Sequence, residues 1–107
     1  MEISRNANSL GYVTNLVVKN TSGTLFGFTG YNSKASAQFI QVFDAAILPA
    51  DAAVPTLTFT AAASSNFSID FGVRGRQFLN GIVICNSSTG PTKTIGSADI
   101  FVDAQYV

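Results

Sequence analysis

Residues 97–107 read Ser-Ala-Asp-Ile-Phe-Val-Asp-Ala-Gln-Tyr-Val and form the longest clean alternation of apolar and polar residues in the chain. Successive side chains of a strand point to opposite faces, so this stretch predicts a β-strand with one apolar and one mostly polar face. We expect this strand to hold the last residues of the sequence inside a sheet. Its expected apolar face carries Ala98, Ile100, Val102, Ala104 and Tyr106.

Six further β-rich runs precede this strand, and clusters of Asn, Ser, Gly and Pro separate them. A stretch at 72–77 is expected to be a loop, and an irregular stretch at 44–53 contains Pro49, which disrupts any long helix. The expected strands cover residues 12–19, 24–31, 36–43, 54–60, 67–71 and 78–85.

Short strands with frequent turns and no convincing helix indicate an all-β fold. We predict a single antiparallel β-sandwich of about seven to eight strands, with Greek-key or jelly-roll order. The domain is expected to span residues 12–107, after a polar N-terminal arm at 1–11. A chain of 107 residues with one Cys can bury a core of this kind without any disulfide.

Three runs, at 25–28, 39–43 and 82–85, are apolar on both faces. Only one face of a strand in a two-layer sandwich points at the core, so a second cover is expected over these runs. The cover is either the loop at 44–53 or another subunit, and the scarcity of helices and long loops favours a subunit. The charged fraction of 11% and net charge of zero also favour assembly, although a Thr- and Ser-rich monomer has the same composition.

The chain contains no His, so Ser-His and Cys-His nucleophiles and His-dependent zinc sites are excluded. Cys85 lies in an apolar run, where a thiol is expected to be buried and inert. Asp99 and Asp103 share a strand face, but carboxylates are common on solvated strands. We therefore predict no enzyme, no metal and no cofactor. A small hydrolase built from Asp and Ser alone is the weakest hypothesis.

Arg74 and Arg76 place two of the six cations in one loop, but a neutral chain lacks the basic stripe of a nucleic-acid-binding protein. No run approaches the ~18 apolar residues of a membrane span. The residues after Met1 lack the apolar core of a signal peptide, so folding in a cytoplasm is expected. Without Trp, the aromatic residues left for glycan contact are Tyr12, Tyr31 and Tyr106.

Four segments carry a resemblance: Ser-Ala-Gln-Phe-Ile-Gln-Val-Phe-Asp at 36–44, Leu-Pro-Ala-Asp-Ala-Ala-Val-Pro at 48–55, Gly-Ile-Val-Ile-Cys-Asn-Ser-Ser-Thr at 81–89 and Thr-Ile-Gly-Ser-Ala-Asp at 94–99. With them, the stretch 31–107 resembles a recurring type of small structural protein encoded in tailed-phage genomes. The resemblance implies a virion component, either a capsid decoration (cement) protein or a head-fibre or tail-associated module that recognises a host glycan or protein.

The resemblance also implies a homo-oligomer, with a trimer as the expected form, bound to the major capsid protein of the same virion. The protein is then made in the host cytoplasm and located in the virion. No nucleic acid, membrane or small-molecule substrate is expected. The candidate interface residues are Arg5, Ile47, Leu48, Pro49, Arg74 and Arg76.

Overall fold

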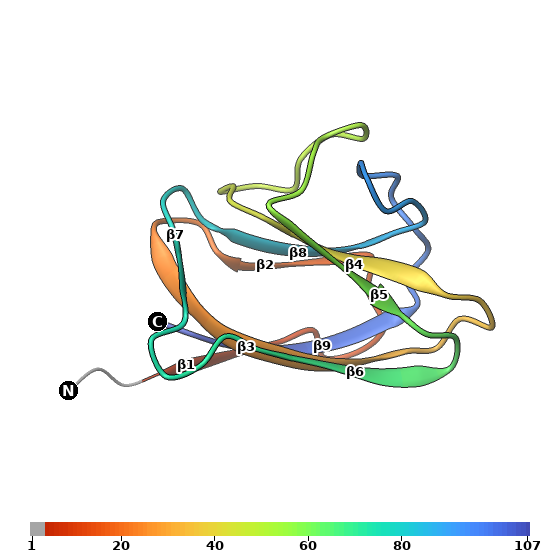
Figure 1. The fold of residues 1–107 in the computed structure, drawn as a ribbon, viewed down its shortest axis with the longest axis horizontal. Helices are drawn as coiled ribbons and strands as arrows, with labels where there is room; N and C mark the ends of the chain where they lie inside the picture. Colours follow the sequence, from red (N-terminus) through yellow and green to blue (C-terminus); the bar gives the residue numbers. More distant parts are fainter. Residues whose placement is uncertain (1–3) are drawn as a thin grey trace.

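The computed structural model describes residues 4–107 as nine strands in two antiparallel sheets, with no helix in this range (Figure 1). The sheets pack face to face, so the predicted all-β sandwich is confirmed. The strands are β1 (Arg5–Asn8), β2 (Asn15–Lys19), β3 (Gly23–Asn32), β4 (Gln38–Phe43), β5 (Leu57–Ala61), β6 (Ser65–Asp70), β7 (Arg76–Phe78), β8 (Ile82–Ser87) and β9 (Ile100–Tyr106).

One sheet has the order β1-β9-β3-β6, with β7 also paired to β3, and the other has the order β2-β8-β4-β5. β6 and β7 pair with different parts of β3 and together act as one interrupted edge strand. With these two counted as one, consecutive strands alternate between the sheets except at β4 and β5, which are neighbours in one sheet, and this is the order of a jelly roll. The predicted jelly-roll-like order is therefore confirmed.

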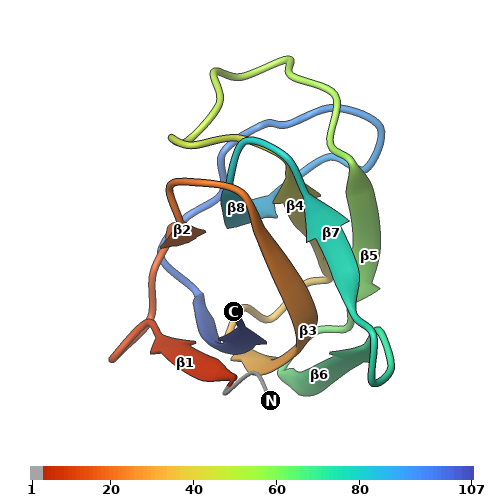
Figure 2. The same cartoon turned by 90° about the vertical axis from the view of Figure 1, so that its left-hand side faces the viewer.

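β9 lies between β1 and β3, as the end-on view of Figure 2 shows. Ile100, Val102 and Ala104 are fully buried and Tyr106 is half-buried, as the predicted apolar face requires, whereas Ala98 is exposed and precedes β9. The N–H of Val107 donates to the carbonyl of Thr24 at 2.9 Å, and the N–H of Thr24 donates back at 3.0 Å. The last residues of the sequence are therefore held in the sheet, as predicted.

Two strands differ from the sequence prediction. The expected arm at 1–11 contains β1, which pairs with β9 from Arg5↔Tyr106 to Asn8↔Asp103, while residues 1–3 lie outside the described part. The expected loop at 72–77 runs into β7, which pairs with β3. Both strands are short and mostly exposed, so backbone pairing with a neighbouring strand holds them in place. Their sequences therefore lack the alternation of apolar and polar residues that predicts a strand.

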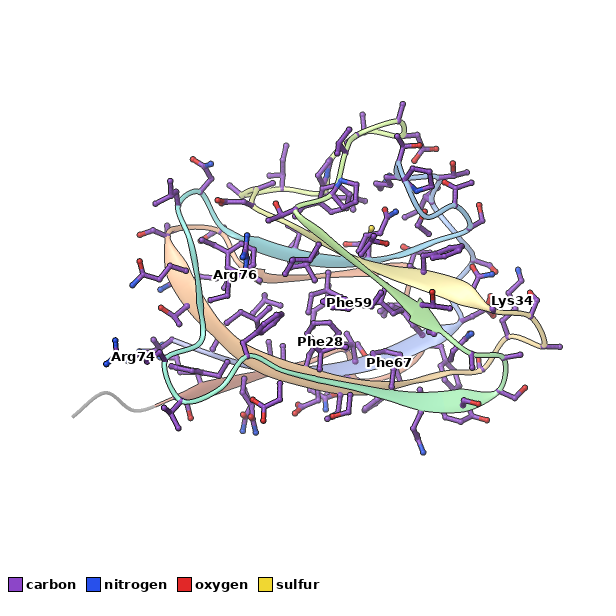
Figure 3. All side chains as sticks on the ribbon, viewed as in Figure 1. Phe28, Lys34, Phe59, Phe67, Arg74 and Arg76 are labelled. Carbon is purple, nitrogen blue, oxygen red and sulfur yellow. The ribbon has the colours of Figure 1, made fainter. Side chains whose placement is uncertain are left out.

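The core between the sheets is built around aromatic contacts. Phe28 of β3 meets Phe59 of β5 and Phe67 of β6 edge to face, with ring centroids 6.0 and 6.1 Å apart (Figure 3). Such pairs contribute about 0.5–1.5 kcal/mol beyond the area they bury. Aliphatic residues from both sheets complete the buried core, chiefly Val18, Leu25, Ile40, Val42, Ile82, Ile84, Ile100 and Val102.

A second apolar cluster lies on the outer face of the β2-β8-β4-β5 sheet. Phe43, Val83 and Cys85 point away from the main core and are nevertheless buried in the single chain. Residues of the loop between β4 and β5 pack on them, and this loop passes over the sheet in Figure 1. For the runs on β4 and β8, the loop of the same chain therefore provides the cover that we expected from another subunit. The third run, at 25–28, lies on β3 in the other sheet, and this loop does not cover it.

Candidate functional site

Two loops, at 44–56 and 88–97, lie over the outer face of the β2-β8-β4-β5 sheet, and we call them the loop crown (Figure 1). They are joined to each other by backbone hydrogen bonds. The N–H of Ala52 donates to the carbonyl of Lys93 at 2.7 Å, and the N–H of Lys93 donates to the carbonyl of Ala53 at 2.8 Å. The crown is therefore one connected layer.

An ion pair holds the crown from within. The Lys93 side chain is only 3% exposed, and its Nζ donates to Asp51 Oδ1 at 2.6 Å. The same carboxylate oxygen accepts the N–H of Ile95 at 3.1 Å. The bond from Lys93, followed by the bond from Ile95, lowers the pKa of Asp51. Asp51 therefore remains a charged acceptor that ties its own loop to the loop at 88–97.

Gln41 fixes the second loop to the sheet below it. This fully buried side chain of β4 donates through Nε2 to the carbonyls of Thr89 and Gly90 at 2.9 Å and of Thr92 at 3.2 Å. Buried amides that bond backbone carbonyls satisfy groups that a loop otherwise leaves to water. The anchoring of this loop explains why a polar residue, Gln41, is buried in a mostly apolar strand.

Large apolar side chains nevertheless remain on the surface of the crown. Ile47 is 75% exposed and Val54 is 76% exposed. Of the predicted interface residues in this loop, Ile47 is available to a partner, whereas Leu48 packs inward on the second apolar cluster and Pro49 is half-buried. The crown presents an apolar surface on a backbone that is already held in place.

The three predicted interface arginines do not join the crown. Arg5 lies on β1 and Arg74 lies in the turn between β6 and β7, both on the other sheet. Arg76 begins β7, and its guanidinium stands 5.9 Å from the centre of the Phe78 ring. Figure 3 shows Arg74 and Arg76 at one end of the sandwich. The six predicted residues therefore belong to separate surfaces.

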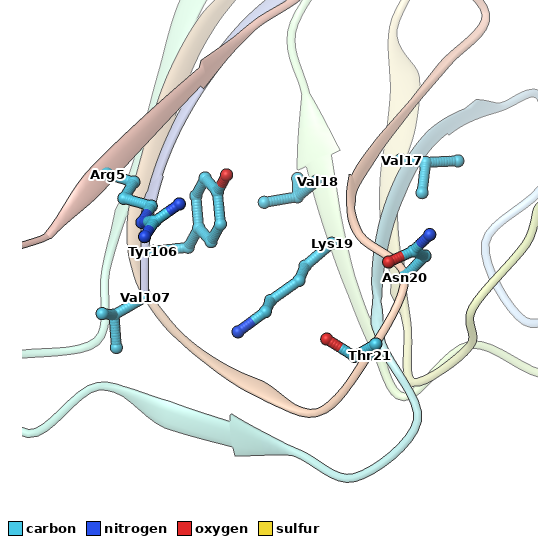
Figure 4. Close-up of a pocket in the computed structure, with 8 residues that line it drawn as sticks. All are labelled: Arg5, Val17, Val18, Lys19, Asn20, Thr21, Tyr106 and Val107. Atoms are coloured by element: carbon cyan, nitrogen blue, oxygen red, sulfur yellow. The ribbon is translucent and has the colours of Figure 1, made fainter.

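Arg5 instead takes part in a hollow of about 490 Å³ at one end of the sandwich (Figure 4). Lys19 of β2 and Tyr106 of β9 share it, because the fold brings β1, β2 and β9 together there. The remaining lining residues are Val17, Val18, Asn20, Thr21 and Val107. The sequence offers no sign of this grouping, because its members are far apart along the chain.

A third polar cluster lies at the surface near the start of β9. The hydroxyl of Ser97 donates to Asp99, and Lys34 Nζ lies 3.4 Å from Ser97 Oγ and 3.9 Å from Asp99 Oδ2. The carbonyl of Asp99 also accepts both the N–H and the hydroxyl of Ser33. These bonds fix the turn before β9, and we interpret the cluster as structural.

Within residues 4–107, no group of three or more Cys, Asp or Glu side chains is arranged to hold a metal ion. The same range contains no helix that is long and apolar enough to cross a membrane. Comparison of the chain with models of protein families, with curated proteins and with solved structures finds no significant match. The resemblance to phage proteins has no support from these comparisons.

Proposed function

We propose that this protein is a non-catalytic structural component of a phage virion, a decoration or cement protein that binds and stabilises the head shell. Two features support the proposal. Segments across about two-thirds of the chain resemble small virion proteins. The jelly-roll order also recurs in viral capsid domains, and this is support by analogy of fold.

The observation that carries the proposal is the apolar surface of the loop crown. Ile47 and Val54 are exposed on the loop at 44–56, which the Asp51–Lys93 pair ties to the loop that Gln41 anchors. A surface that is already ordered loses little conformational entropy when a partner covers it. Repeated over many copies on a lattice, even modest contacts of this kind stabilise an assembled shell.

The proposed partner is the major capsid protein of the same virion, and the proposed form is a homotrimer made in the host cytoplasm. Support for the trimer is now the resemblance alone. The outer faces of β4 and β8 are covered within the chain, so they no longer require a neighbouring subunit.

The proposal is tested on virions purified from cells that carry the genome encoding this chain. Mass spectrometry is expected to find the protein at a copy number comparable with that of the coat protein. A virion that lacks the protein contradicts the proposal.

Rebinding to shells stripped of the protein then locates the contact surface. The double variant I47S/V54S is expected to bind at least tenfold more weakly than the wild type. The matched control V73S/L79S changes two apolar residues outside the crown that are more exposed, at 97% and 79%, and it is expected to bind normally. Equal loss in both variants contradicts a contact through the crown.

A second candidate function is a head-fibre or tail-associated module that recognises a host surface glycan or protein. The hollow with Arg5, Lys19 and Tyr106 favours this candidate, because it combines an aromatic ring with polar donors. Jelly rolls also recur among lectins, which is again an analogy of fold. Reproducible hits on a glycan array, together with absence from the shell, support this function over the first.

A further inference from the structure

We propose that the hollow between β1, β2 and β9 binds an oxyanion, specifically the phosphate group of a small polar molecule such as a phosphorylated sugar. This inference is independent of a role in the virion. It depends on how the fold places Arg5, Lys19 and Tyr106 around one space (Figure 4).

Lys19 is aimed at this space by two local features of the backbone. The pairing of β2 with β8 shifts register between Val17 and Lys19, and such bulges redirect the side chains that follow them. Gly23 then leaves room for the lysine stem, because a Cβ at this position would lie 2.8 Å from Lys19 Cδ. The same Cβ would lie 2.7 Å from the carbonyl oxygen of Val107.

Arg5 approaches the hollow from the opposite sheet. It is paired across strands with Tyr106, so the guanidinium and the phenol ring share one end of the sandwich. A guanidinium presents a planar fork of donors that matches phosphate oxygens, and an ammonium adds a compact charge. The Tyr106 hydroxyl, the Asn20 amide and the Thr21 hydroxyl provide neutral donors on the same lining.

The charge of the hollow favours an anion. Among the described residues, no Asp or Glu side chain lines it, and two cationic side chains stand against the main-chain carboxyl of Val107. The two ion pairs within residues 4–107 are Lys34–Asp99 and Lys93–Asp51, so neither Arg5 nor Lys19 is paired with a carboxylate of this described part. Two cations that share a partly enclosed space raise the local concentration of anions.

The size of the hollow favours an oxyanion that is attached to a larger molecule. A volume of about 490 Å³ is many times the roughly 30 Å³ that one water occupies in the liquid. The space therefore accommodates a phosphate together with part of the molecule that carries it. The Tyr106 ring offers an apolar face to that part, as aromatic residues do for sugars.

The test is isothermal titration and amide NMR titration of the whole chain at low ionic strength with three probes. These are inorganic phosphate, glucose 6-phosphate and glucose. We expect both phosphates to bind and to shift the amide signals of residues 18–21 and 105–107, whereas glucose alone does not bind. Tighter binding of the ester identifies a phosphorylated molecule as the ligand, and equal binding identifies the free oxyanion. Absence of binding by both phosphates overturns the proposal.

Variants R5Q and K19Q are each expected to weaken phosphate binding by about tenfold, because each removes a charge-assisted hydrogen bond. The matched control R74Q removes an exposed arginine outside the hollow and is expected to bind like the wild type. Thermal unfolding of each variant, measured beside the wild type, checks that the variant is folded. Equal weakening by R74Q overturns the proposal, since it means that net charge alone governs binding.

Discussion

Lys93 is a charged residue in an almost fully buried position, and this placement has consequences for the two loops around it. Its ammonium bonds Asp51, and its backbone N–H and carbonyl bond residues 52 and 53. One residue therefore links both loops through its side chain and through its main chain. Removing Asp51 and removing Lys93 should therefore affect stability differently, because the Lys93 side chain is buried and the Asp51 side chain is not.

Asp51→Ala is expected to lower the melting temperature more than Lys93→Met. The first change leaves the Lys93 ammonium buried without its carboxylate partner, whereas the second replaces the buried charge with an apolar chain of similar length. Thermal unfolding of the two variants beside the wild type measures this order. The reverse order contradicts the account of Lys93 as a buried charge that needs its partner.

The acid stability of the protein depends on two carboxylates with lowered pKa values. The backbone N–H of Asn80 is the largest cause for Asp44, and the side chain of Lys93 is the largest cause for Asp51. As the pH falls, the unfolded chain takes up these protons first, so the stabilisation is complete above a pH of about 4 and is lost below it.

Urea midpoints measured from pH 6 to pH 2 are expected to fall as the pH drops below about 4. The variant D44N/D51N is expected to show a shallower fall over the same interval, because it lacks the two groups whose pKa values are lowered. Parallel curves for the variant and the wild type contradict the assignment of acid sensitivity to these groups.

At the scale of elements, the loop at 44–56 has a structural side and an exposed side. Leu48 packs on Phe43, Val83 and Cys85, whereas its neighbour Ile47 is exposed to solvent. An irregular segment that covers a sheet face in this way replaces the helix or second subunit that usually buries such a face.

Leu48→Ala is expected to lower the free energy of unfolding by about 1–2 kcal/mol, which is below the range for a fully buried leucine. Ile47→Ala is expected to change it by less than about 0.5 kcal/mol, as is usual for exposed positions. Urea unfolding of the two adjacent variants measures the difference. Equal effects contradict the inward packing of Leu48.

At the scale of the whole molecule, the sequence predicts the strands that have an apolar face, and a strand is found at each predicted place. The expected strand at 78–85 is divided, because Phe78 ends β7 and only residues 82–85 lie in β8. The alternation at 97–107 identifies β9, and similar patterns identify β2, β3, β4, β5, β6 and β8. β1 and β7 are missed because they are held mainly by backbone pairing. For the cover over Val83 and Cys85, the sequence favours a subunit over the loop at 44–53, and the loop is what the structure shows; side-chain pattern alone does not reveal the path of an irregular loop.

The hollow could not be predicted in the same way. Arg5, Lys19 and Tyr106 meet only because the jelly-roll order places the first and last strands side by side and sets β2 across from them. No local pattern carries that information, since it depends on pairing between distant parts of the chain. Only the three-dimensional structure shows that Arg5 lines the same hollow as Lys19 and Tyr106.

The central claim is that the chain covers its own second apolar cluster, and the labelling rate of Cys85 tests it most directly. Burial raises the pKa of this thiol to about 12, and the side chain is fully covered by the chain itself. The account predicts slow labelling by a thiol reagent at pH 8, at a rate independent of protein concentration, and rapid labelling in denaturant. Rapid labelling of the folded protein, or labelling that accelerates on dilution, would contradict the claim and assign the cover to another subunit.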